Sequence, residues 1–233
     1  MSSDAAAPLA RLSELGQSVW IDNLSRESIR GGHLQSLIDD FSVVGATSNP
    51  TIFQKAMTTG DAYDEQIKEL SGEQPDGKTV LWALAKRDIK DACDVFRPVW
   101  ERSAGRDGYV SLEVDPGLAY ETLATFREAI ELHQSVDRPN LMVKIPATKP
   151  GLAAIEDVLA EGHSINVTLI FSLGRYAEVA ESYVRGIERL VAATPARRPG
   201  TGPEIAEAVV FFLKSSRFVT GQLLAVDGGL SLK

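Results

Sequence analysis

A single lysine stands inside an apolar run of the kind that forms strands, Leu-Met-Val-Lys-Ile-Pro at residues 141–146. Lys144 either points into solvent or lies in a site where its charge is poorly solvated. An amine that loses its proton in such a site attacks a carbonyl carbon and forms a Schiff base. Lys144 is therefore the candidate nucleophile of this chain.

Two carboxylates lie in similar apolar runs, Asp22 in VWIDN and Glu113 in YVSLEVDP. A carboxylate within hydrogen-bond reach of a reacting group, directly or through one water, can supply or accept the proton that the reaction moves. One lysine and two carboxylates on separate strands are the groups that an imine-forming aldol enzyme requires. The residue types favour an enzyme that acts on carbonyl compounds.

Strand alternation predicts which side chains share a face with these groups. It places Ser111 beside Glu113 and sets both Asn166 and Thr168 on one face of SINVTLIF. On a half-exposed strand this polar face would meet water. In a barrel the apolar face packs on helices, so the polar face, with Lys144, would line the interior. The alternation alone leaves both interpretations open.

Short apolar runs alternate with longer amphipathic ones along the chain. The predicted strands are Ser18–Ile21, Val43–Thr47, Tyr109–Val114, Leu141–Ile145 and Ser164–Ile170. The predicted helices are Ser25–Asp39, Ala62–Leu70, Val80–Ser103, Leu118–Gln134, Lys149–Glu161 and Leu173–Ala193. Strand followed by helix, repeated, predicts a parallel α/β sheet or barrel, with its site at the carboxyl ends of the strands.

The composition excludes several classes of partner. The chain has 233 residues, 44% of them hydrophobic, and a net charge of −8, which argues against a nucleic-acid or anionic-membrane surface. One cysteine, Cys93, permits no intrachain disulfide and is expected to be a small core residue. We see no secretory signal and no membrane-length apolar run, so we expect a cytoplasmic protein.

The three histidines, His33, His133 and His163, are far apart and match no metal-ligand spacing. We expect them at the surface or at helix ends, and we expect no metal.

Five segments carry a resemblance to a known family. SVWIDNLSR, GATSNPTIF, GYVSLEVDP, NLMVKIPAT and INVTLIFS, in this order, resemble transaldolase over roughly residues 10–193. The resemblance implies a (β/α)8 TIM barrel, here truncated after the fifth βα unit. It implies transfer of a dihydroxyacetone unit between sugar phosphates in the non-oxidative pentose phosphate pathway, from sedoheptulose 7-phosphate to glyceraldehyde 3-phosphate, with no cofactor. Asn49 and Asn166 match the residues that contact substrate hydroxyls.

The resemblance also assigns the catalytic groups. Lys144 matches the Schiff-base lysine, and Asp22 matches the acid/base at the substrate's C4 hydroxyl. Glu113 matches the carboxylate that works through a water in forming and hydrolysing the imine, and Thr168 matches the residue that holds this water.

The character of the sequence changes near residue 194. Residues 194–203, TPARRPGTGP, read as a linker, and residues 203–232 resemble the C-terminal end of a short-chain dehydrogenase/reductase. We therefore predict a barrel portion at 1–193, a linker at 194–203 and a tail at 204–233, the last with a helix Pro203–Ser215 and a strand Phe218–Val226. The chain has neither the glycine-rich nucleotide turn nor the YxxxK pair of that second family, so we expect no binding of NAD or NADP.

The resemblance to transaldolase is incomplete. The family's phosphate-binding serine and arginine have no match here, and Arg175 is expected to be only a charge at a helix start. Five βα units would leave two open sheet edges, which favours self-association. An inactive fusion or truncated remnant is the alternative to an enzyme, and an NAD(P)-dependent oxidoreductase is less favoured still.

Overall fold

Five parallel strands form one sheet in the part of the chain that the structure, a computed structural model, describes: residues 3–48, 61–71, 76–198, 200–201 and 203. They are β1 (Val19–Ile21), β2 (Val43–Thr47), β3 (Tyr109–Glu113), β4 (Leu141–Pro146) and β5 (Ile165–Thr168). Their order in the sheet is their order in the chain. Each strand therefore reaches the next through a helical crossover, as in a (β/α)8 barrel, and five units make an open half-barrel.

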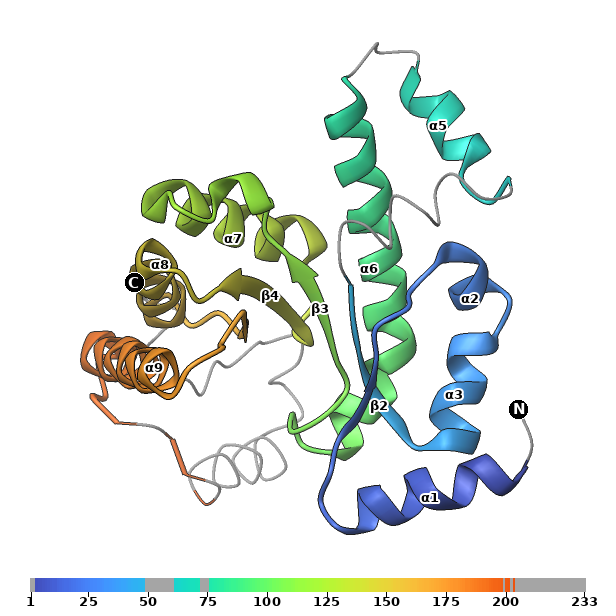
Figure 1. Cartoon of the computed structure of the whole chain (residues 1–233), viewed down its shortest axis with the longest axis horizontal. Coiled ribbons are helices and arrows are strands. Elements are labelled where there is room, and N and C mark those ends of the chain that lie inside the picture. Colours follow the sequence, from blue (N-terminus) through green and yellow to red (C-terminus); the bar gives the residue numbers. More distant parts are fainter. Residues whose placement is uncertain (1–2, 49–60, 72–75, 199, 202, 204–233) are drawn as a thin grey trace, which may run out of the picture.

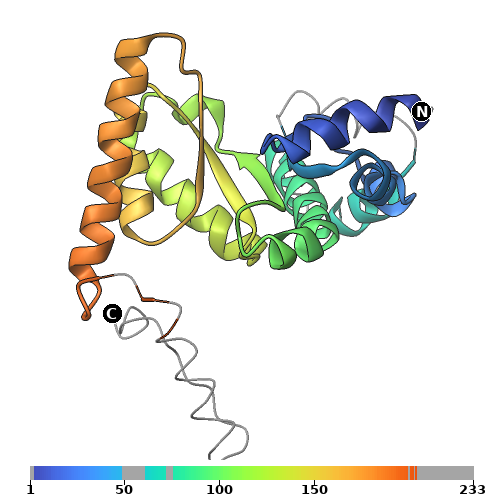
Figure 2. The same cartoon turned by 90° about the horizontal axis from the view of Figure 1, so that it is seen from below.

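Helices follow the strands around the outside of this half-barrel (Figure 1). They are α1 (Ser3–Glu14), α2 (Arg26–Arg30), α3 (His33–Phe41), α5 (Asp64–Ser71), α6 (Gly77–Arg102), α7 (Thr122–Val136), α8 (Lys149–Ala160) and α9 (Leu173–Ala193). A short 3-10 turn, Pro116–Leu118, follows β3. Figure 2 shows α1 and α9 at opposite ends of the molecule. None of these described helices combines the length and apolar character that crossing a bilayer requires.

The alternation in β3 decides between the two interpretations of the polar face. Val110 and Leu112 are buried and share a core cluster with Phe96 of α6 and Leu132 of α7. The apolar face thus packs outward on helices, with about 1.5–3 kcal/mol of hydrophobic stabilisation for each large side chain. Ser111, on the opposite face of the same strand, points to the interior of the half-barrel.

Polar caps fix where the crossover helices begin. Ser25, Asp76, Thr148 and Ser172 each accept a hydrogen bond from a backbone N–H in the first turn of the following helix. Such a cap contributes about 1 kcal/mol and sets the register at which the helix leaves its loop. Two of these helices, α8 and α9, begin close to the predicted residues.

The prediction of one helix over Ser25–Asp39 is wrong. The helix is interrupted at Gly31 and Gly32, which separate α2 from α3. Gly32 adopts a positive φ of 79°. A residue without a Cβ takes this conformation at little cost, which ends one helix and starts another. The helix α1 was not predicted from the sequence. The predicted tail elements, except for Pro203 itself, lie outside the described residues.

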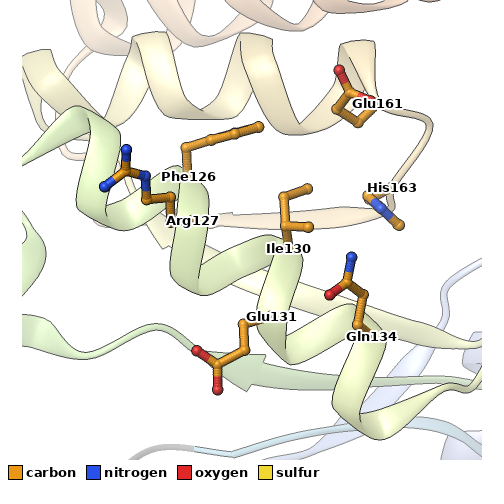
Figure 3. Close-up of a pocket in the computed structure, with 7 residues that line it drawn as sticks. All are labelled: Phe126, Arg127, Ile130, Glu131, Gln134, Glu161 and His163. Carbon is orange, nitrogen blue, oxygen red and sulfur yellow. The ribbon is translucent and has the colours of Figure 1, made fainter.

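The expectation that the histidines are far apart is wrong for two of them. The rings of His133, in the last turn of α7, and His163, before β5, stack with centroids 4.4 Å apart. Beside them a hollow of about 330 Å³ opens between α7 and the end of α8 (Figure 3). Glu161 and His163 face it from one side, and Ile130 of α7 faces it from the other. The hollow lies at the amino ends of the strands, beside the start of β5, whereas the predicted site lies at their carboxyl ends.

Candidate active site

An ion pair joins two of the predicted catalytic residues. Lys144 Nζ lies 2.9 Å from Glu113 Oε2, and the two side chains are only 12% and 18% exposed. The contact follows from the sheet, because Glu113 of β3 and Lys144 of β4 are register partners. Two neighbouring strands thus place the candidate nucleophile against a candidate proton carrier.

A backbone carbonyl holds the same lysine from the other side. Lys144 Nζ donates a hydrogen bond to the carbonyl oxygen of Ser48, at 3.0 Å. Ser48 follows β2 and is itself fixed, because its N–H and its hydroxyl both donate to the carbonyl of Ser111. Ser48 was not predicted from the sequence, because it contacts Lys144 through its backbone carbonyl and not through its side chain. Its place at the polar end of a strand was the only signal in the sequence.

Asn166 and Thr168 extend the site onto β5. Asn166 is the register partner of Lys144, and Thr168 is the partner of Pro146. The Asn166 amide donates to the hydroxyl of Ser111 at 2.9 Å, so a buried serine of β3 orients it across the strand between them. Lys144, Glu113, Asn166 and Thr168 therefore lie together on three adjacent strands.

Asp22 lies apart from this group. It follows β1, which is separated from β4 by β2 and β3, and its side chain is exposed. It borders a hollow of about 640 Å³ together with residues of α2 and α3. Among the described residues, none forms a hydrogen bond or ion pair with its carboxylate. The backbone on either side of Asp22 therefore sets where the carboxylate lies.

The other candidate, Asn49, lies outside the described residues, directly after Ser48.

Charged groups from two helices fix the loop that follows β3. Lys78 of α6 pairs with Asp115, and this contact, with a hydrogen bond from Gly117 N–H, lowers the pKa of Asp115. Asp115 N–H donates to Glu128 of α7, whose pKa is raised because the carboxyl is partly buried. These contacts hold the carboxyl end of β3, which carries Glu113, against the helix layer.

Arg175 has the structural role that the sequence predicted. It lies in the first turn of α9 and pairs with Glu178 one turn later, at 2.7 Å.

A family model decides the relationship. The model described as Transaldolase/Fructose-6-phosphate aldolase matches residues 19–213. The chain belongs to this family. The match includes all five strands and continues past residue 193, where the sequence analysis placed the end of the barrel portion. The resemblance of residues 203–232 to a short-chain dehydrogenase stays a prediction from motif.

The curated relatives with similar sequences are named transaldolase. A transaldolase of Mycobacterium bovis is 56% identical over 181 residues, which are 78% of this chain and 48% of the relative. Transaldolases of Mycobacterium ulcerans and of a Parafrankia strain are each 54% identical, over 79% and 80% of this chain and 50% of their own length. The chain therefore spans about half the length of the curated relatives it matches.

Proposed function

We propose that this chain carries a transaldolase site, which transfers a dihydroxyacetone unit between sugar phosphates through a Schiff base on Lys144. The observation that supports this most is the contact of 2.9 Å between Lys144 and Glu113 in a member of this family. It places a proton acceptor against the only amine on the interior face of β4.

The first step uses this ion pair. One proton passes from the Lys144 ammonium to Glu113, which leaves a neutral amine and a carboxylic acid. The amine attacks the C2 carbonyl of a ketose phosphate such as sedoheptulose 7-phosphate or fructose 6-phosphate. Glu113 then returns its proton, through a water held by Thr168, to the carbinolamine hydroxyl. That hydroxyl leaves as water, and a protonated imine remains.

The second step breaks one carbon–carbon bond. Asp22 takes the proton of the C4 hydroxyl, the C3–C4 bond breaks, and its electrons flow into the protonated imine. The phosphorylated aldehyde leaves, and a three-carbon enamine stays on Lys144. An acceptor aldehyde adds by the reverse steps, and hydrolysis of the new imine frees the product. Asn166 and Asn49 are proposed to bind substrate hydroxyls.

Every step uses side chains of this chain, so the proposal invokes neither a metal nor an organic cofactor. We assign the reaction to the non-oxidative pentose phosphate pathway and to the cytoplasm.

Borohydride trapping tests the proposal. The protein is incubated with fructose 6-phosphate, reduced with borohydride and analysed by peptide mass spectrometry. We expect a reduced three-carbon adduct on Lys144. Lys144→Ala should abolish it, whereas Lys149→Ala, which removes an exposed lysine at the start of α8, should leave it unchanged. Absence of an adduct on the unaltered chain would favour an inactive remnant instead.

We also propose self-association through the open sheet edge. Within the described residues β5 pairs with β4 alone, and the chain after it exposes Phe171 and Leu173 by 86% and 89%. Exposed apolar side chains beside an unpaired edge favour contact with a second chain. Sedimentation velocity over a range of concentrations should show oligomers, and a Phe171→Ser, Leu173→Ser double variant should weaken them.

A further inference from the structure

One residue of a buried ionic cluster, Arg26, lies four positions after Asp22 in the chain. Arg26 of α2 and Asp88 of α6 are 2% and 0% exposed, and Arg26 Nε donates to Asp88 Oδ1 at 2.7 Å. Tyr63, which precedes α5, donates its hydroxyl to Asp88 Oδ2 at 2.7 Å. The same hydroxyl accepts a hydrogen bond from Arg26 N–H at 3.1 Å. The Arg26–Tyr63–Asp88 cluster thus joins three elements that are far apart in the sequence.

The geometry of the cluster leaves little freedom to any member. The Arg26 guanidinium lies over the Tyr63 ring, 4.3 Å from its centroid, and also reaches the carbonyl of Leu84. Burial raises the pKa of Tyr63, so its hydroxyl keeps the proton that it donates to Asp88. Both oxygens of Asp88 have a partner, and the Tyr63 hydroxyl both donates and accepts.

Stability alone does not account for such a cluster. Taking two charges out of water costs about as much as their attraction returns, so apolar residues of the same volume often serve a core equally well. What a fully satisfied buried network adds is a single defined arrangement of the elements that it joins. The element that this arrangement fixes most directly is the loop between β1 and α2.

That loop carries Asp22. Only three residues separate Asp22 from Arg26, and one of them, Leu24, is buried in the core. Ser25 begins α2 with a cap, so the chain is held at Leu24, Ser25 and Arg26 in succession. Because no described residue bonds the Asp22 carboxylate itself, these anchors and β1 determine where it lies.

We propose that the Arg26–Tyr63–Asp88 cluster is a positioning device that holds Asp22 in place for carbon–carbon bond cleavage. The proposal rests on the proposed function, since it assigns the cluster to one of its two chemical steps. No member of the cluster touches the substrate. Its effect reaches the reaction only through the backbone between Arg26 and Asp22.

The two steps of the reaction give a test that a merely structural role would not satisfy. Tyr63→Phe removes one hydroxyl and keeps the ring over Arg26, so the variant should fold. Single-turnover release of glyceraldehyde 3-phosphate from fructose 6-phosphate reports cleavage, and borohydride trapping at short times reports imine formation. We expect cleavage to slow about tenfold, since small misplacements of a reacting group carry penalties of this order. Imine formation, which depends on Lys144 and Glu113, should stay within about twofold.

Asn140, at the amino ends of the strands, provides a matched control. The buried side chain of Asn140 donates to the carbonyls of Cys93 and Gly108, ahead of β4 and away from the carboxyl ends of the strands. Asn140→Ala also breaks a buried polar network and should lower Tm, yet both rates should stay within about twofold of the unaltered chain. Arg26→Lys, which keeps the charge but loses the planar donor, should behave like Tyr63→Phe.

The outcomes separate the two proposals. Equal slowing of both steps in Tyr63→Phe, or slowing of neither, would overturn the positioning role while leaving the Schiff-base chemistry intact. Slowing of cleavage by Asn140→Ala to the same extent would overturn it as well, because the effect would then follow general destabilisation. No adduct on the unaltered chain would remove the proposed function and, with it, the positioning role.

Discussion

At the scale of single residues, the proposed chemistry depends on how one proton is shared between Lys144 and Glu113. The two groups form an ion pair, and Ser48 O accepts a second hydrogen bond from the same ammonium. An ammonium cannot attack a carbonyl, so the proposed reaction starts only after the proton has moved from Lys144 to Glu113. Asp22, which lies apart on another strand, takes no part in that exchange. The two carboxylates should therefore be separable by mutation.

We expect Glu113→Gln to slow imine formation by about 100-fold, a typical loss when a proton carrier is removed. Asp22→Asn should leave imine formation nearly unchanged and slow cleavage by a similar factor. Rapid-quench trapping measures the first rate, and aldehyde release in a single turnover measures the second. If the two variants impaired both steps to the same extent, the division of roles would be wrong.

His133 offers a prediction about stability that is independent of the site. Its Nε2 lies 2.9 Å from the carbonyl of Ser164, which can only accept, so the ring is neutral with its proton on Nε2 or fully protonated. Burial, and secondarily His163, lowers the pKa of His133 to about 4. Glu161 and Asp137 lie near the pair from the ends of α8 and α7.

A pKa lowered by folding means that the unfolded chain binds the proton more tightly. The contribution of His133 to the free energy of unfolding is therefore fully present above its ordinary pKa of about 6.5. It falls by at most about 3 kcal/mol as the pH drops from there to about 4. His133→Gln keeps a donor to Ser164 and should remove this part of the slope. Urea titrations at several pH values measure it. The control is His33→Gln at the exposed start of α3; an equally reduced slope there would refute the assignment.

At the scale of elements, local signals predicted what neighbours in the chain determine. The alternation in YVSLEVDP gave the correct faces of β3, and the buried Ser111 and half-buried Glu113 lie on the interior side. The predicted first residues of two helices, Lys149 and Leu173, are those of α8 and α9, which Thr148 and Ser172 cap. These features depend on residues within one turn or one strand, so the sequence carries them.

What the sequence could not predict depends on contacts between distant segments. No residue near His133 in the sequence indicates His163 as its stacking partner, because 29 residues, with β4 and α8 among them, separate the two. The Arg26–Tyr63–Asp88 cluster likewise joins α2, the residue just before α5, and α6. Predicting the contact between Glu113 and Lys144 required the order of the strands in the sheet. The sequence indicated that order only through its resemblance to a family.

The break between α2 and α3 gives a prediction at this scale. Gly32 has a φ of 79° and open space where a Cβ would lie, so Gly32→Ala should destabilise the fold by about 1 kcal/mol through backbone conformation alone. Gly174, in the first turn of α9, has equally open space but an ordinary φ. Gly174→Ala should therefore be neutral or slightly stabilising. Thermal and urea unfolding compare the two, and equal losses would contradict this account.

At the scale of the whole molecule, five βα units supply the groups of the proposed reaction, while the curated relatives are about twice as long as the matched region. The groups on β3, β4 and β5 need only neighbouring strands to assemble. Binding of a substrate phosphate at a distance from the reacting carbon provides positioning energy that such strands do not. The part of a relative that this chain does not match is where we expect that energy to arise.

Completion of the barrel is the prediction that follows. Residues 194–233 are replaced by the C-terminal part of the Mycobacterium bovis transaldolase that follows its counterpart of residue 193; the two chains are 56% identical over 181 residues. We expect kcat/KM for fructose 6-phosphate with an acceptor aldehyde to rise by about 100-fold or more, because a remote phosphate contact improves both binding and orientation. Self-association should fall at the same time, since the new strands would cover β5 and Phe171. The control is the same chimera with Lys144→Ala, which should be inactive but equally monomeric. A parent chain that is already monomeric and as active as the chimera would show that its own C-terminal residues complete the fold.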